Sequence, residues 1–517
     1  MQVLDYGGYL ERAARLFRDR PAVIDESGRV TWGELHAQAE ALAVGLSNLG
    51  LQPGDRVVEI HFNSIRAVVV DFALALSGLV RVPINPRLMP DEIERMVSIV
   101  GPRAVVTTGE HSEAVARARA GSPSIEFVIA DGVPGALSAA DIGAARQGPR
   151  PVIQPDGLVT LRFTGGTSGF PKAVMAQQAT QIGFSAMMLM DLFDIRRDDL
   201  VLQTQPYSHG GGNATLAIAM RGGGLLLQRK FEADAVLDAI ETERTTILKL
   251  VPTVLHRLIR AQRQNPRDVS SLRLIVYGAA PMREELLHEA FSVFACDFAQ
   301  IYGQAEAQST IACLTMRDHE QERKAPTGLL RSVGRPFAMT DIVILDSDGS
   351  PLAADVVGEV ATRGVLTADG YWNDPEMTRQ KFRDGWVRSG DLGYLSEDGY
   401  LFLVGRASDM IISGGFNVYP AEVEATLVNI PGVREAAVSA VTDADWGERV
   451  VAAVICREGA HLTAQGVRRA CRERLAGYKC PKDIQFVDEL PLNVNGKVDR
   501  RALRELFAGK VRTEQLA

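Results

Sequence analysis

The sequence has few cysteines, and their spacing is not typical of a disulfide framework or a zinc site. The five are Cys296, Cys313, Cys456, Cys471 and Cys480, with no Cys-x-x-Cys pair and no His/Cys cluster. Long apolar runs are also missing: the longest, residues 68–80, contains Asp71 and is too short to span a membrane. Both absences fit a protein of the reducing cytoplasm, which is the location that we expect.

An excess of positive charge is absent as well. The formal net charge is −8 at pH 7, which argues against a general surface for nucleic acid or for an anionic membrane. The segment at residues 10–20 reads LERAARLFRDR, a charged amphipathic pattern rather than the apolar core of a signal peptide. We therefore expect no nucleic-acid partner and no membrane partner. The oligomeric state is open, with a homodimer as the assembly to test.

What the sequence does contain is enough apolar material, 46% of 517 residues, for two or more domains. Helical and strand patterns alternate over the first four hundred residues. A helical period from Leu35 to Leu49 ends at Gly50 and precedes a strand-like run at 56–62, and a helix at 234–242 precedes runs at 246–251 and 272–277. Such alternation predicts mostly parallel sheets covered by helices.

The character of the sequence changes near Gly405. Shorter apolar runs follow at 436–440, 450–455 and 484–487, with helical segments between them. We predict an α/β protein with a large N-terminal domain of mostly parallel sheets over residues 1–405. A small, mobile α+β C-terminal domain is predicted over residues 406–517, joined by a short hinge at 406–410.

The most informative segment is the loop at residues 164–174, which reads TGGTSGFPKAV after an apolar strand-like run, 158–163. Its glycines allow positive φ, so that backbone N–H groups can converge on an anion, and its hydroxyls and lysine add donors. The expected phosphate-binding residues are Thr164, Gly165, Gly166, Thr167, Ser168, Gly169 and Lys172. The loop is not the P-loop of ordinary NTPases, because Ala173 follows the lysine where that motif has a metal-binding hydroxyl.

Four further segments occur in a fixed order with this loop. They read IYGQAE at 301–306, WVRSGDLG at 386–393, GRASDMIISGGFNVYPAEVE at 405–424 and PLNVNGKVDR at 491–500. Together the five motifs resemble those of the adenylate-forming superfamily of acyl-CoA synthetases, adenylation domains and firefly luciferases. The resemblance covers the chain from about residue 31 to residue 503.

The resemblance implies an acid–thiol ligase that uses ATP, Mg²⁺ and coenzyme A. Tyr302 would stack on adenine, Glu306 would hold the magnesium, Asp391 would accept the ribose hydroxyls and Arg406 would reach the ribose or phosphate. Lys497 would place its ammonium between the carboxylate and the α-phosphate. Further nucleotide contacts would come from Gly278, Ala279, Ala280, Gly303 and Gln304.

A second half-reaction is also implied by the resemblance. The small domain would rotate about Asp409, moving Lys497 away from the acyl-adenylate. Gly414, Gly415 and Phe416 would then lie along the pantetheine arm of CoA, where bare backbone leaves room for it. The thiol would attack the acyl carbonyl, and AMP would leave.

The acyl pocket is expected around residues 205–213, which read QPYSHGGGN, with His209 at its mouth and residues 278–281 on the opposite wall. Three glycines after His209 remove side-chain volume, which favours a bulky or aromatic acid. The HGGG run also occurs in the oxyanion motif of lipases, but the sequence has no Gly-x-Ser-x-Gly nucleophile elbow.

Several positions depart from the superfamily pattern. Ala305 stands where a threonine is usual, Gly165 and Ser168 replace serine and threonine in the loop, and Ala173 replaces a glycine. A missing hydrogen bond to a charged group, at about 1.5 to 3 kcal/mol, predicts slowed adenylation. Three alternatives follow: a complete acyl-CoA ligase, a specialist in the thioester half-reaction or in loading a carrier protein, and a non-catalytic relative. The third would be expected to lack Lys172, Glu306 or Lys497, and all three are present.

Overall fold

The computed structural model describes residues 5–138, 142, 151, 153–154, 156–164, 171–443, 446–492 and 498–508. Contacts within the chain divide it into two compact units. The first unit contains Met1–Ile342, Ala361–Arg388 and Gly399–Leu401, and the second contains Val343–Val360, Ser389–Asp398 and Phe402–Ala517. Each unit is described by itself.

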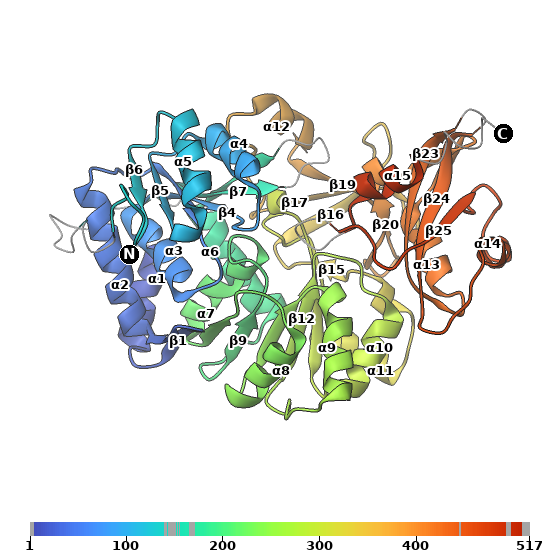
Figure 1. Cartoon of the computed structure of the whole chain (residues 1–517), viewed down its shortest axis with the longest axis horizontal. Coiled ribbons are helices and arrows are strands. Elements are labelled where there is room, and N and C mark those ends of the chain that lie inside the picture. The colour runs from blue at the N-terminus through green and yellow to red at the C-terminus, as the bar shows by residue number, and fades with distance from the viewer. Residues whose placement is uncertain are drawn as a thin grey trace. The chain divides into compact units, whose positions relative to one another are not determined.

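A mostly parallel sheet of six strands forms one layer of the described part of the first unit (Figure 1). Its order is β6 (Phe127–Ile129), β5 (Ala104–Thr107), β3 (Arg56–Ile60), β4 (Val80–Ile84), β7 (Leu158–Thr164) and β8 (Lys172–Gln177). Only the hairpin pair β7 and β8 is antiparallel within these strands. Side chains such as Val58, Val82 and Val105 pack with Ile93 of α4 (Pro90–Val100) and Val115 of α5 (Ser112–Gly121), so these helices cover one face.

A second sheet in this unit has nine strands among the described residues. Its order is β15 (Arg335–Pro336), β14 (Ala312–Leu314), β13 (Asp297–Tyr302), β12 (Leu274–Gly278), β11 (Ile247–Leu250), β9 (Leu200–Gln203), β10 (Gly224–Leu227), β1 (Pro21–Asp25) and β2 (Gly28–Thr31). The helices α8 (Ala233–Thr242), α9 (Pro252–Gln264) and α10 (Glu284–Val293) lie together beside it (Figure 1). Leu237, Leu255 and Leu287 from these helices pack on Leu248 and Ile275 of the strands.

A layer of helices shares one core with both sheets. It contains α1 (Tyr6–Leu16), α2 (Trp32–Asn48), α3 (Ile65–Ser77), α6 (Gln178–Met187) and α7 (Thr215–Arg221). Trp32 and Phe72 are buried there with Val57 of the six-stranded sheet and Val201 of the nine-stranded sheet. Apolar side chains therefore cover both faces of each parallel sheet, which confirms the α/β fold that the alternating pattern predicts.

The predicted alternation is wrong beyond about residue 335. Five strands follow one another there with one described α-helix between them: β16 (Thr340–Leu345), β17 (Gly358–Gly364), α12 (Pro375–Lys381), β18 (Phe382–Arg383), β19 (Trp386–Leu395) and β20 (Leu401–Arg406). β18 and β19 pair in antiparallel fashion across a tight turn at Asp384 and Gly385, both with positive φ. A short turn between antiparallel strands needs no crossover helix, which explains the difference.

The second unit includes an α+β body after residue 406. Its strands are β21 (Ile411–Ser413), β22 (Phe416–Val418), β23 (Val433–Asp443), β24 (Gly447–Cys456) and β25 (Asp483–Phe486), with helices α13 (Pro420–Val428), α14 (Ala464–Arg472) and α15 (Arg500–Ala508). Val423 and Leu427 of α13 pack on Val438 and Val450 of the two long strands. The boundary at residue 405 stays a prediction. Of the described helices, none is both long and apolar enough to cross a membrane.

Candidate active site

Four parallel strands of the nine-stranded sheet bring the predicted nucleotide and acyl segments to one edge. β9, β11, β12 and β13 are parallel neighbours in this sheet, so their carboxyl ends lie side by side. The loop with His209 follows β9, Ala279 follows β12, and Tyr302 ends β13. This edge is where α/β sheets bind ligands.

Lys172 lies at the start of β8, directly opposite Thr164 in the β7–β8 hairpin. Its Nζ lies 5.6 Å from the ring centroid of Tyr371. The loop residues Gly165, Gly166, Thr167, Ser168 and Gly169 lie outside the described residues, so their predicted contacts stay predictions. What the described part shows is that the two ends of this loop are held in register by the hairpin.

Glu306 is 6% exposed, and its Oε1 accepts a hydrogen bond of 2.7 Å from the Tyr371 hydroxyl. Burial and then the charge of Glu306 raise the pKa of Tyr371, so the phenol keeps its proton and remains a donor. Ala305 packs against the cluster of Val174 and Tyr371. The position that lacks the usual threonine hydroxyl is therefore next to another hydroxyl that orients the carboxylate.

These residues fit a magnesium–nucleotide complex. In the described part of the chain, no group of three or more His, Cys, Asp or Glu side chains could hold a metal ion. The single carboxylate of Glu306 suits Mg²⁺, because this ion is commonly held by one or two carboxylates together with substrate phosphates and water. Within the described ranges, the buried Nε2 of Gln304 has no hydrogen-bond partner, and Gln304 is two positions after Tyr302 in the sequence. An unpaired buried donor at this position matches the acceptor atoms of an adenine ring.

The glycines at this edge are required by packing. A Cβ on Gly278 would lie 2.4 Å from the Ile301 carbonyl oxygen, and one on Gly303 would lie 2.2 Å from the Ser309 carbonyl carbon. Ala279 has φ 66°, a left-handed conformation that is rare for a side chain with a Cβ. The wall predicted opposite His209 is therefore a rigid backbone surface.

His209 precedes the 3-10 turn η3 (Gly210–Ala214), and its Nδ1 lies 3.1 Å from Ser208 Oγ. Part of the ring reaches solvent. The surrounding protein, and then the charge of Arg162, lower the pKa of His209 to about 4. The imidazole is therefore neutral at pH 7 and can act as an acceptor or donor at the mouth of a pocket.

Asp391 in the second unit is held by Arg406. The carboxylate belongs to β19 and is 9% exposed, and its Oδ1 lies 3.1 Å from Arg406 Nε at the end of β20. The ion pair fixes one oxygen of the carboxylate, and a carboxylate held in this way can accept hydrogen bonds from ribose hydroxyls. The two residues are thus brought together within this unit.

Asp409 ends the 3-10 turn η6 (Ala407–Asp409) and pairs with Arg500, whose Nε lies 3.1 Å from Asp409 Oδ2. Arg500 also donates to Glu424 Oε1 at 2.9 Å and to the Val438 carbonyl. Lys497 lies outside the described residues. Arg500, three positions after it, begins α15 and is held by this network.

Gly414 and Gly415 form the turn between β21 and β22, with φ 59° and 81°. A Cβ on Gly414 would lie 2.9 Å from the Trp446 ring, whereas one on Gly415 would meet nothing within 4 Å. Phe416 is 56% exposed and stacks on Tyr478, with ring centroids 4.6 Å apart. The turn presents bare backbone beside an exposed aromatic pair.

The structure adds three residues that no motif contains: Tyr371, Arg162 and Lys249. Two of them carry a signal in the sequence, because Arg162 and Lys249 are single charges inside apolar strands, LVTLRF at 158–163 and TILKLV at 246–251. Tyr371 carries none that spacing alone could show. Arg500 ends the motif at 491–500, but its ion pair with Asp409 appears only in the structure.

Comparisons with known proteins agree with this arrangement. The family model for AMP-binding enzymes matches residues 10–372, and the model for the C-terminal domain of AMP-binding enzymes matches residues 422–497. Feruloyl-CoA synthase from Amycolatopsis sp is 34% identical over 97% of this chain and 99% of its own length. Indoleacetate–CoA ligase from Aromatoleum aromaticum is 33% identical over 99% of this chain and all of its own.

A solved structure supports the same conclusion. The amide bond synthetase McbA from Marinactinospora thermotolerans has a TM-score of 0.88 and 32% identity, covering 97% of this chain and 99% of that one. Both family models and the relatives therefore identify the same family as the ordered motifs. The chain belongs to the family of AMP-binding enzymes, the adenylate-forming superfamily that its motifs resemble.

Proposed function

We propose that this enzyme is an acyl-CoA ligase that activates a bulky or aromatic carboxylic acid. It is an AMP-forming acid–thiol ligase, and it uses ATP, Mg²⁺ and coenzyme A. The observation that carries the proposal is a set of features of the first unit. Lys172 closes the β7–β8 hairpin of the six-stranded sheet, while the buried carboxylate of Glu306 and the turn of three glycines follow strands β13 and β9 of the nine-stranded sheet. Magnesium supplies charge neutralisation between the phosphates and the attacking carboxylate.

The residues of this chain divide the work of the first half-reaction. A carboxylate is a poor electrophile, so activation requires its oxygen to approach the α-phosphate, and the like charges must be screened. Thr164, Lys172 and the loop between them bind the phosphates in this proposal, and Glu306 holds the metal. Tyr371 keeps the Glu306 carboxylate in place through its hydrogen bond of 2.7 Å. Lys497 brings the remaining positive charge.

The second half-reaction uses the small domain, residues 406–517 in this proposal, which turns about Asp409. Gly414 and Gly415 leave the space along which the pantetheine arm passes, and Phe416 contacts it. Support comes from the turn with positive φ at both glycines: a Cβ on Gly415 would project into open space, and one on Gly414 would lie 2.9 Å from the Trp446 ring. The thiol then adds to the acyl carbonyl, and AMP leaves with the pair of electrons of the broken bond.

The acid is bulky or aromatic in this proposal. The two relatives are named a feruloyl-CoA synthase and an indoleacetate–CoA ligase, and both of these acyl groups are aromatic. A Cβ on Gly210 would lie 3.1 Å from Gln205 Oε1, and one on Gly212 would lie 2.7 Å from the Tyr207 carbonyl oxygen, so packing requires these two glycines. The choice of acid therefore rests on the two relatives.

A pyrophosphate-release screen tests the proposal. Acids graded from acetate through hexanoate to cinnamate-sized and indole-sized acids are supplied with ATP and Mg²⁺, and thioester formation is followed in parallel with CoA. We expect the rate to rise with size and to require CoA for release of product. Pyrophosphate release that is fastest with acetate would contradict the choice of acid, and none with any acid would contradict adenylation.

The similarity to an amide bond synthetase supports one second candidate, in which an amine accepts the acyl group. The same assay distinguishes the two, because amines and CoA can be offered to one preformed acyl-adenylate. Amide formed faster than thioester would favour the second candidate.

A further inference from the structure

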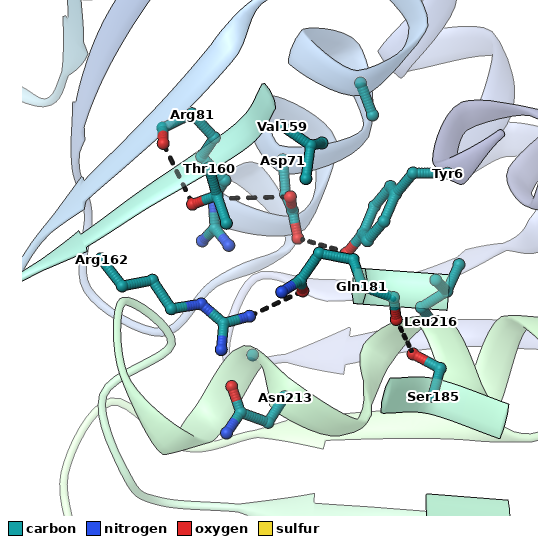
Figure 2. Close-up of a pocket in the computed structure, with 12 residues that line it drawn as sticks. Tyr6, Asp71, Arg81, Val159, Thr160, Arg162, Gln181, Ser185, Asn213 and Leu216 are labelled. Carbon is teal, nitrogen blue, oxygen red and sulfur yellow. Dashed lines mark hydrogen bonds and ion pairs between the residues drawn. The ribbon is translucent and has the colours of Figure 1, made fainter. Parts of the chain in front are cut away.

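A buried polar cavity lies beside the three-glycine turn of the first unit (Figure 2). It is lined by residues of α1, α3, β4, β7, α6, η3 and α7: Tyr6, Asp71, Ala75, Arg81, Val159, Thr160, Arg162, Gln181, Ser185, Gly212, Asn213 and Leu216. Two residues of the turn that follows His209, Gly212 and Asn213, therefore line this cavity.

One half of the cavity wall contains a cation with carboxylate partners. Arg81 contacts both Glu59 and Asp71, at 3.4 Å from its Nε to Asp71 Oδ1. The other oxygen of Asp71 accepts hydrogen bonds from Tyr6 at 3.2 Å and from Tyr207 at 2.8 Å. Glu59 Oε2 has no hydrogen-bond partner among the described residues, but these contacts account for the Arg81 charge as part of a structural network.

Arg162 on the opposite half is not balanced in this way. Among the described residues no carboxylate forms an ion pair with it, and its Nη2 donates to the neutral Oε1 of Gln181 at 2.7 Å. Figure 2 shows its side chain reaching toward Gln181. Burial, and then the charge of Arg81, lower the pKa of Arg162 to about 10. A guanidinium in this setting keeps most of its hydrogen-bond donors for another partner.

Lys249 on β11 is a second buried cation near the same turn. It is 6% exposed, and its Nζ donates to the Gly210 carbonyl. Burial and then Arg162 lower its pKa to about 8, with no carboxylate offsetting the effect. Arg162 and Lys249 therefore sense each other's charge while both lie against the turn at residues 210–213.

Neutral side chains around them are also incompletely paired. Gln181 connects Arg162 to Gln308. Its Oε1 accepts a hydrogen bond from Arg162, and its Nε2 donates one to Gln308 Oε1 at 2.7 Å. The Nε2 of Gln308 and the Oε1 of Gln203, both on residues with 0% exposure, have no partner. Gln203 is the strand neighbour of Lys249.

Lys249 is buried and Arg162 is half-buried, and neither has a carboxylate ion-pair partner among the described residues. Tyr6 and Asp71 offset the charge of Arg162 only in part. Charge in such surroundings is unfavourable, and an apolar residue of similar volume would avoid that cost. An anion bound beside these two cations would compensate their positive charges. We propose that the acid activated by this enzyme carries a second carboxylate, and that Arg162 and Lys249 bind it. This inference rests on the proposed function, and it names the far end of the substrate.

Matched pairs of acids test the inference. The pairs are hexanoate with adipate, and 3-phenylpropanoate with 3-(4-carboxyphenyl)propanoate. The rate of pyrophosphate release is measured for each acid. We expect kcat/KM for the better diacid to exceed that for its monoacid by at least about tenfold, the worth of one hydrogen bond to a charged group. Arg162→Met and Lys249→Met should each remove most of that preference while changing the monoacid rate by less than about threefold. Arg257→Met, at an exposed position of α9, is the charge-matched control and should leave the preference unchanged.

Two results would overturn the inference. One is a monoacid rate that equals or exceeds the diacid rate in both pairs. The other is an equal loss for both members of a pair in Arg162→Met, because that would mean that Arg162 binds the reacting carboxylate. Melting temperatures of each variant, with and without adipate or the aromatic diacid, provide a second measurement that needs no turnover. A diacid shift in the unmodified protein that Arg162→Met abolishes supports the inference even if no acid is adenylated, in which case the proposed function fails alone.

Discussion

Tyr371 is a positioning residue for the predicted metal carboxylate. Its hydroxyl donates to Glu306, and its ring packs edge-on to Phe382 at 5.8 Å. Tyr371→Phe keeps the ring and removes the hydrogen bond to a charged acceptor, worth about 1.5 to 3 kcal/mol. We expect pyrophosphate release to fall roughly ten- to a hundred-fold and the Mg²⁺ concentration for half-maximal rate to rise.

Tyr394→Phe is the matched control for that experiment, because Tyr394 belongs to the second unit and stacks there on Phe402. Thioester formation from a supplied acyl-adenylate should be unchanged in both variants. An unchanged Mg²⁺ dependence in Tyr371→Phe would mean that the hydrogen bond serves packing alone.

Lys249 also predicts a pH dependence of stability. Burial lowers its pKa from 10.5 to about 8 in the folded protein, so between these pH values the unfolded chain binds more protons. The free energy of unfolding therefore rises with pH across that window as the buried charge is lost. Lys249→Met should melt at a higher temperature than the unmodified protein at pH 7, and the gap should shrink toward pH 10.

The exposed Lys230→Met is the control, and its difference from the unmodified protein should show no such narrowing. If the difference in melting temperature between Lys249→Met and the unmodified protein does not change with pH, the difference comes from the side-chain volume and not from the charge of Lys249.

At this scale the sequence predicts motif residues better than their supports. Glu306 and Lys172 belong to ordered motifs, so their chemistry can be inferred from residue type and spacing. Tyr371 is 65 positions from Glu306, and only the folded chain brings its hydroxyl to the carboxylate. The sequence shows Arg162 as a charge in an apolar strand. Only the structure shows that no carboxylate is among its described partners.

At the scale of elements, the turn between β21 and β22 offers a matched pair of glycines. Gly415 and Gly459 belong to the same unit, have φ 81° and 74°, and would each place a Cβ in open space. An alanine at either position should cost about 1 to 2 kcal/mol of stability, because left-handed backbone is strained for residues with a Cβ. Gly415→Ala should in addition lower the rate of thioester formation, whereas Gly459→Ala should not.

Gly415→Leu extends the series, since a larger side chain fills more of the proposed pantetheine path. Acyl-adenylate formation should stay within about threefold of the unmodified rate once the loss of stability is matched to Gly459→Ala. Parallel loss of both half-reactions in the Gly415 variants alone would assign the glycine to folding.

The element boundaries show where periodicity is informative. The predicted helix at 234–242 is α8 (Ala233–Thr242), and the run at 272–277 is β12 (Leu274–Gly278). Those segments have regular apolar spacing and lie in covered parallel sheets. β19 alternates half-buried and buried residues and follows β18 across a turn, so a helix–strand pattern does not describe this part of the chain.

At the scale of the whole molecule, the proposal assigns Lys497 to one half-reaction. Lys497→Ala should lower pyrophosphate release by at least about a hundred-fold, the effect of losing one preorganised charge donor. Conversion of a supplied acyl-adenylate and CoA to thioester should survive, because the small domain then presents another face. Single-turnover rates of the two halves measure this, and a matched fall in both would contradict alternation.

Arg504→Ala is the control in the last helix, since Arg504 is exposed and its described contact is with the Arg500 carbonyl. Both half-reactions should keep their rates in that variant. A large loss there would mean that α15 itself, rather than the lysine, limits adenylation.

The first helix of the chain contributes to the wall of the polar cavity. Tyr6 reaches Asp71 through its hydroxyl and Gln178 through its backbone amide, at 2.9 Å. Those contacts join residues 65 and 172 positions apart, so α1 can make both of them only after the chain has been synthesised as far as Gln178. Detachment of α1 would open the cavity, and a ligand bound in it would oppose that local opening. Slower amide hydrogen exchange in α1 would therefore report occupation of a cavity that lies mainly among later parts of the chain.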